Sequence, residues 1–265
     1  MRILVSGWRR IAAVLVLAAW AGVASAQITD IHSAINKAGR QRMLSQRMAK
    51  AYFQLGQAVD VERSQRVLDS SIALFDRQLV ELKNYAPIPE IRDTYLSLQQ
   101  SWLAYKDALV GATPSKTGGK TVLALSEDVL KLAHQGTGQL EKHAGSNTGR
   151  LVNIAGRQRM LSQRMAKFYQ AIGWGVGDGV SSGELEKARK EFIAAHEELR
   201  KAGGESGPLK ESLERVGRQW IFFDAALGQR GGDRRSYFAT DVAAASELIL
   251  QEMETAVGLF EKLPK

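Results

Sequence analysis

The sequence of 265 residues has no cysteine and only five prolines, and aromatic residues make up 7% of it. Without cysteine the protein can form neither disulfides nor zinc-thiolate sites, and it has no thiol nucleophile. Segments that alternate between polar and β-branched apolar residues are also missing, so no β-sheet is predicted. Helix-forming residues dominate between clusters of breakers, which predicts an all-α protein stabilised by packing.

Long apolar runs are equally scarce. One run, residues 11–23, follows three arginines and precedes Ala24-Ser25-Ala26. This order is typical of a secretory signal peptide, predicted at residues 1–26 with cleavage before Gln27. The run is short for a membrane span, which needs roughly 20 apolar residues. An uncleaved anchor and twin-arginine export are the weaker alternatives to the general secretory route. No transmembrane segment is predicted in the mature chain, so we expect a periplasmic protein.

Charge excludes one class of partner. The net charge is +8, and the predicted leader contributes three of these positive charges, so the mature chain keeps +5 at pH 7. This surplus is compatible with anionic small ligands or anionic surfaces. A nucleic-acid-binding protein would be more basic and would not be exported, so nucleic acid is set aside.

The chain carries one basic segment twice. Thirteen residues, Ala38–Lys50, recur without change at Ala155–Lys167. The offset of 117 residues also relates scattered positions further along, including Phe75 and Phe192, so the repeating unit is a whole domain. We predict a first bundle at residues 27–145 and a second at 146–265. Each unit is large enough to bury a core of its own.

Breakers divide each half into four helices. The predicted helices are residues 28–58, 61–85, 89–110 and 119–143 in the first half, and 149–174, 182–202, 208–228 and 234–262 in the second. Short connections imply antiparallel neighbours. The predicted fold is therefore two tandem antiparallel four-helix bundles, with Trp102 and Trp220 in their cores.

The repeated helix has two useful faces. One stripe, suited to packing inside its own bundle, consists of Leu44, Met48, Ala51 and Leu55. The other, at heptad spacing, places an arginine among small and apolar residues, namely Ile35, Ala38, Arg42, Ser45, Ala49 and Tyr52. Its copy contains Ala155, Arg159, Ser162, Ala166 and Tyr169. Small residues allow close approach, so we predict that the two copies pair through this second stripe.

If the two helices pair, Arg42 and Arg159 face each other in a partly desolvated seam, where their charges repel. An anion between them would offset this repulsion. The planar guanidinium fork donates hydrogen bonds in parallel pairs, which suits nitrate, nitrite or a carboxylate. Ser45 and Ser162 lie on the same stripe and are further candidate ligand-binding residues.

The block from Ile35 to Lys50, INKAGRQRMLSQRMAK, resembles the periplasmic motif of nitrate/nitrite sensor kinases, and more closely the amino-terminal domain of the type IV pilus chemotaxis transducer. In the sensor kinases, one arginine from each protomer of a homodimer grips a single nitrate. The resemblance implies that role for Arg42 and Arg159. It also implies ligand-site positions for Lys37, Arg47 and Arg164, although the second copy departs from the pattern by placing isoleucine opposite Lys37.

The resemblance leaves assembly open. One chain could make internally the pairing that receptors make between protomers, as a monomer with an internal pseudo-dimer, or it could form a homodimer. No kinase or methyl-accepting region follows the repeats in this sequence. We therefore expect any signal to pass to a membrane sensor, chemoreceptor or pilus component.

Other interpretations of the basic helix stand beside the ligand site. Arg42 and Arg159 could form salt bridges inside their bundles. The remaining cations of the motif could be ordinary solvated or snorkelling side chains, namely Arg40, Arg47, Lys50, Arg157, Arg164 and Lys167. The same charge could also dock an acidic protein or an anionic lipid surface.

Signs of catalysis are lacking. The four histidines are scattered, and none lies in a metal-binding pair such as H-E-x-x-H. Nucleophile and phosphate-binding motifs are missing too. We predict a non-enzyme without metal or cofactor. The leading hypothesis is an exported sensory module that binds a small oxyanion, and the alternative is an interaction module that docks a pilus, envelope or receptor component.

Overall fold

The computed structural model describes residues 28–204, 207–229 and 235–263, so the predicted signal peptide lies outside the described residues. Within these ranges the chain is helical and has no strand, which confirms the predicted all-α class. The first half contains α2 (Ile31–Gly56), α3 (Val61–Tyr85), α4 (Pro89–Val110) and α5 (Lys116–Ala144). The second half contains α6 (Asn147–Trp174), α7 (Gly179–Ala202), α8 (Pro208–Gly228) and α9 (Arg235–Glu261).

Capping residues explain where the helices begin. The side chain of Ser115 accepts a hydrogen bond from Gly118 N, so α5 begins three residues earlier than predicted. Asp178 caps α7 in the same way, and α7 also begins three residues early. The predicted bounds of α3 and α4 are confirmed, and α4 has a proline in its first turn.

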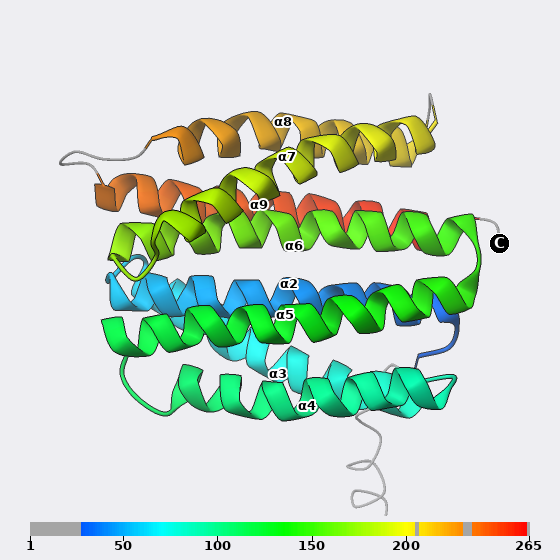
Figure 1. Ribbon diagram of the computed structural model, residues 1–265. Helices are drawn as coiled ribbons and strands as arrows, with labels where there is room; N and C mark the ends of the chain where they lie inside the picture. Colours follow the sequence, from blue (N-terminus) through cyan, green and yellow to red (C-terminus); the bar gives the residue numbers. More distant parts are fainter. Residues whose placement is uncertain (1–27, 205–206, 230–234, 264–265) are drawn as a thin grey trace, which may run out of the picture.

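The two bundles lie side by side, as Figure 1 shows. α5 ends at Gly145, whose φ of +59° suits a residue without a side chain, and Ser146 caps α6, which returns along the molecule. α2 and α6 therefore run parallel in the middle, with α3 and α4 outside one and α7 and α8 outside the other. The packing of α2 on α6 is the most extensive contact between helices in the described structure.

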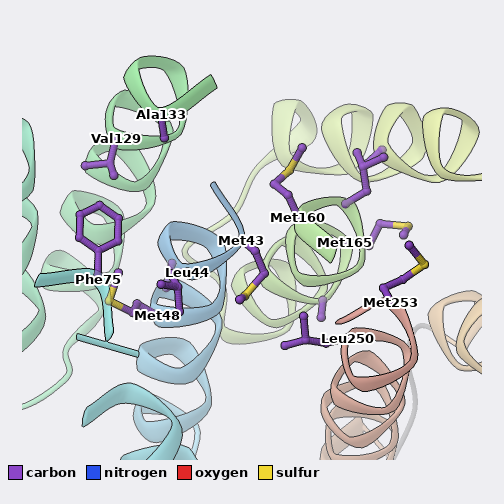
Figure 2. Packing of buried hydrophobic residues seen from close by; sticks show 14 of the residues in the cluster. Met43, Leu44, Met48, Phe75, Val129, Ala133, Met160, Met165, Leu250 and Met253 are labelled. Atoms are coloured by element: carbon purple, nitrogen blue, oxygen red, sulfur yellow. The ribbon is translucent and has the colours of Figure 1, made fainter. Parts of the chain in front are cut away.

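Each bundle has an apolar core beneath its central helix. Leu44 and Met48 point toward Phe75, whereas Met43 points the other way, toward the second bundle (Figure 2). The stripe predicted to pack inside the bundle is thus confirmed. Trp102 is buried as predicted, while Trp220 is partly buried and stacks on Phe192 with ring centroids 4.5 Å apart.

Glutamines of the repeated motif tie the central helices to their own bundles. Buried side chains donate to backbone carbonyls of neighbouring helices in matching pairs, Gln41 to Phe75 and Gln158 to Phe192, then Gln46 to Ser126 and Gln163 to Ser246. Because each amide nitrogen donates to a backbone carbonyl of its own bundle, these side chains hold the register of α2 and α6 there, although Oε1 of Gln41, Gln158 and Gln163 has no hydrogen-bond partner. None of the described helices is long and apolar enough to cross a membrane.

Candidate functional site in the seam between the repeated helices

α2 and α6 come close together where two equivalent glycines face each other. A Cβ atom placed on Gly39 would lie 3.6 Å from the Cα atom of Gly156, and one on Gly156 would lie 3.7 Å from the Cα atom of Gly39. The missing side chains leave room for the terminal Nη2 atoms of Arg42 and Arg159, which lie 3.2–3.5 Å from these two positions. We call the facing surfaces around these four residues the seam.

The two predicted arginines come together in the seam and are fully buried. Each crosses to the other helix. Arg42 Nη2 donates to the backbone O and side-chain Oδ1 of Asn153, at 3.2 and 2.7 Å. Arg159 Nη2 donates to the same atoms of Asn36, at 3.1 and 2.8 Å. The pattern has the pseudo-two-fold symmetry expected of a duplicated helix.

Each asparagine is oriented by a carboxylate from the last helix of a bundle. Asn36 Nδ2 donates to Glu261 Oε2 at 2.7 Å, and Asn153 Nδ2 donates to Glu141. With its amide nitrogen occupied, each carboxamide presents its oxygen to an arginine. A carboxamide oxygen therefore holds the acceptor position that an oxyanion would take.

The two arginines differ in the partner of their second terminal nitrogen, Nη1. Arg159 Nη1 donates to Glu254 Oε2 at 2.7 Å, whereas Arg42 Nη1 lies 3.3 Å from His134 Nδ1. His134 precedes Glu254 by 120 residues, the offset that also relates Glu141 to Glu261, so the two are equivalent positions. Among the described residues, Arg42 forms no ion pair.

The pKa values of the two arginines are affected by this difference in partners. Burial, followed by the charges of Arg157 and Arg159, lowers the pKa of Arg42 to about 9, so the guanidinium stays protonated at neutral pH. Burial also lowers the pKa of Arg159, but Glu254 opposes the change. The Nε atoms of both arginines are buried without a hydrogen-bond partner. A buried cation without a counter-charge is costly, so the seam is electrostatically suited to an anion.

Three other candidate residues have local partners. Lys37 forms an ion pair of 2.7 Å with Glu81 on α3. Ser45 and Ser162 are buried, and each donates its hydroxyl to the carbonyl of the arginine three residues earlier, at 2.8 and 2.9 Å. The structure therefore places these three side chains in contacts within one bundle.

Four further cations of the motif form two equivalent clusters that join the bundles. Lys50 Nζ lies 2.6 Å from Glu247 on α9, and Arg47 pairs with the same carboxylate. In the other copy, Lys167 and Arg164 pair with Glu127 on α5. The lysines are 1% and 0% exposed, so the interpretation of these cations as solvated side chains is wrong for them. Acidic residues from the other bundle make burial possible.

A signal for these clusters was present in the sequence. The pair Ser-Glu occurs at residues 126–127 and again at 246–247, at the offset that relates the last helices of the two halves. In both places the serine hydroxyl accepts a hydrogen bond from the buried lysine, at 3.2 and 3.0 Å. Burial alone would raise the pKa of Glu127 and Glu247, but the adjacent lysine and arginine lower it to about 2 in each.

Metal chemistry finds no matching donor set. Within the part of the chain that the structure describes, no group of three or more histidine, cysteine, aspartate or glutamate side chains could hold a metal ion. His196 is buried against Phe192, with ring centroids 6.2 Å apart, and burial lowers its pKa.

Fold and seam together define an all-helical protein of two tandem bundles that are paired through a duplicated, arginine-bearing helix. Residues 23–127 and 144–254 each match the PilJ family model, described as the Type IV pili methyl-accepting chemotaxis transducer N-term. Because these matches cover more than half of the chain, the protein belongs to this family and carries its domain twice. No curated protein and no solved structure was found to match the chain.

Proposed function

We propose that this protein is a non-catalytic sensory module of the periplasm that binds one small oxyanion, nitrate or nitrite first, between Arg42 and Arg159. The observation that carries the proposal is a pair of fully buried arginines whose Nη2 atoms meet over Gly39 and Gly156, with one of them lacking a carboxylate. Membership in a chemotaxis transducer family supports a sensory role.

The asparagines suggest how binding would act. An oxyanion entering the seam displaces the carboxamide oxygens of Asn36 and Asn153, which hold hydrogen bonds of 2.8 and 2.7 Å to the arginines. Each asparagine lies on the helix opposite its arginine, so releasing it breaks hydrogen bonds between α2 and α6. The two helices can then slide from the present arrangement to a second one. The ligand biases the two arrangements only if it binds one of them better.

Signal output requires another protein. We propose that a membrane sensor, a chemoreceptor or a pilus component reads the shift between α2 and α6. Since both copies of the motif lie in one chain, the protein works as a monomer with one shared site, in place of a homodimer.

The test is thermal unfolding of the mature chain with nitrate, nitrite and chloride at constant ionic strength. A ligand at about 100 times its Kd stabilises by about 2.7 kcal/mol. We expect this gain with nitrate or nitrite but not with chloride, and one anion per monomer by calorimetry with light scattering. Arg42→Ala and Arg159→Ala should each remove the gain, because the two arginines act as a unit.

Arg66→Ala is the matched control, since Arg66 carries the same charge on the surface of α3, where its side chain is 71% exposed. It should leave the anion response unchanged. A full nitrate response in either seam variant, or none in the wild type, would overturn the proposal.

An interaction module is the second candidate. Docking through the basic face of the repeated helix does not fit, because Lys50 and Lys167 are buried in ion pairs. A different surface favours this function: Ile221 and Phe222 on α8 are 66% and 68% exposed. A wild-type protein that gains no stability from any anion would shift the balance toward this candidate.

A further inference from the structure

A cavity of about 240 Å³ opens between α5 of the first bundle and α6 and α7 of the second. Its walls carry Lys131 and His134 from α5, Arg157 and Arg164 from α6, and Lys187 from α7. Met160, labelled in Figure 2, and Leu161 add apolar surface. A concave site with apolar walls and a few convergent polar groups is the usual form of a small-molecule site.

The cavity has more positive than negative charge. Arg157 pairs with Glu191 at 2.8 Å, and Arg164 pairs with Glu127 and Glu184. Lys131 and Lys187 form no ion pair among the described residues. In addition, Arg157 Nε is buried without a hydrogen-bond partner. Three lining carboxylates thus face four lining lysines and arginines, two of which are unpaired.

The other half of the molecule shows which group is missing. There Glu254 accepts hydrogen bonds from Arg40, at 3.1 and 2.6 Å, and from Arg159, at 2.7 Å. The repeat-equivalent arginines on this side are Arg157 and Arg42. The equivalent of Glu254 is His134, which is exposed and lines the cavity. One copy therefore has a carboxylate that closes the cluster, and the other has an opening.

We propose that this cavity binds a small dicarboxylate, one end of which takes the place of the missing glutamate carboxylate beside His134 and Arg157. The second carboxylate lies with Lys131 and Lys187, on α5 and α7. Leu130, Leu161 and other apolar lining residues contact the carbon chain. The guanidinium fork of Arg157 matches a carboxylate in shape and charge.

His134 is prepared to donate to such a ligand. Arg42 can only donate, so the 3.3 Å contact from its Nη1 makes His134 Nδ1 the acceptor. Partial desolvation and the charges of Arg42 and Arg157 lower the pKa of His134, so its ring is neutral at neutral pH. The proton then resides on Nε2, which leaves one N–H donor for a carboxylate oxygen.

The cavity is separate from the seam site. Its lining residues do not include Arg42, Arg159, Asn36 or Asn153, although His134 of the cavity lies 3.3 Å from Arg42 Nη1. The two proposals can still fail separately, because Lys131 and Lys187 line the cavity while Arg159 lies in the seam.

Titration calorimetry with succinate, at constant ionic strength, tests the proposal on the mature chain. We expect saturable binding of succinate and weaker binding of acetate and sulfate. Lys131→Gln combined with Lys187→Gln should weaken succinate binding about ten-fold or more, since both lysines lose their charge-assisted hydrogen bonds to the second carboxylate. The matched control is Lys142→Gln with Lys190→Gln, on the same two helices but outside the cavity, and it should bind as the wild type does.

His134→Glu gives the second arm. The new carboxylate should pair with Arg42 and Arg157, as Glu254 pairs with Arg159 and Arg40, so succinate binding should be lost while the melting temperature rises. Arg159→Ala should keep succinate binding even though it removes the nitrate response. Unchanged succinate affinity in the lysine pair or in His134→Glu would overturn the proposal, as would equal binding of sulfate and succinate.

Discussion

At the scale of single residues, the unusual feature of this protein is charge buried between its two halves. Lys50 and Lys167 are almost completely buried, and burial lowers the pKa of each to about 8 although a glutamate opposes the change. The carboxylate from the other bundle that lies beside each lysine favours its protonated form. Removing one partner of such a pair leaves a buried charge without compensation.

We therefore predict that Glu247→Gln lowers the free energy of unfolding by about 3 kcal/mol, because it leaves both Lys50 and Arg47 without their carboxylate. Urea denaturation followed by circular dichroism measures this change. Glu62→Gln is the control, since the side chain of Glu62 is 90% exposed and its carboxylate forms one long ion pair, of 3.9 Å, with Arg66. It should change stability by less than about 0.5 kcal/mol, and equal effects of the two variants would show that the cluster contributes nothing.

At the scale of helices, the pairing of α2 with α6 depends on small residues. Gly39 and Gly156 let the two backbones come close enough for each arginine to reach the asparagine of the opposite helix. A glycine within a helix costs about 0.5–1 kcal/mol relative to alanine, so its use at this crossing reflects the close approach.

We predict that Gly39→Leu destabilises the protein by about 1–3 kcal/mol or more, since its side chain would push against Arg42 and the α6 backbone. Gly138→Leu, on α5, has no atom within 4 Å of the added Cβ and should stabilise by about 0.5–1 kcal/mol through helix propensity. Thermal unfolding of the two variants compares them directly. A neutral Gly39→Leu would mean that the two helices do not pack as closely as described.

At the scale of the whole molecule, the halves are held together by ion pairs that cross from one bundle to the other. Glu127 on α5 binds cations of α6, while Glu247 and Glu254 on α9 bind cations of α2 and α6. For Glu254, as for the other two, burial would raise the pKa, but the neighbouring cations lower it to about 2. Carboxylates with such depressed pKa values stabilise the folded state only while they are ionised.

The predicted consequence is a loss of stability in acid. Because these pKa values are near 4.5 in the unfolded chain and about 2 in the folded one, their contribution is fully present above about pH 4.5 and is lost as the pH falls toward 2. Melting temperatures measured from pH 7 to pH 2 should fall over this window. The fall should be shallower in Glu247→Gln, which lacks one of the three groups, and an unchanged pH profile in that variant would contradict the assignment.

Much of this architecture could be predicted from local patterns. The exact repeat of Ala38–Lys50 implied a duplicated domain, and the clustered breakers marked the helices to within three residues at every described end. The stripe around Arg42 identified the two arginines that meet between α2 and α6, but the helices come close at Gly39 and Gly156, which lie beside that stripe. These features depend on periodicity and turn chemistry, which are properties of short segments of chain.

What the sequence by itself determined is therefore the helical class, the duplication and the arginine that each repeated helix brings to the other. Only the tertiary structure decided which charges are buried and which are compensated. Lys50 pairs with Glu247, nearly 200 residues away in the sequence. His134 occupies the position in the first half that is equivalent to Glu254 in the second. Such contacts come from the relative placement of distant helices, so neither helix period nor local spacing contains them, and the free energy of each charge depends on its three-dimensional neighbours.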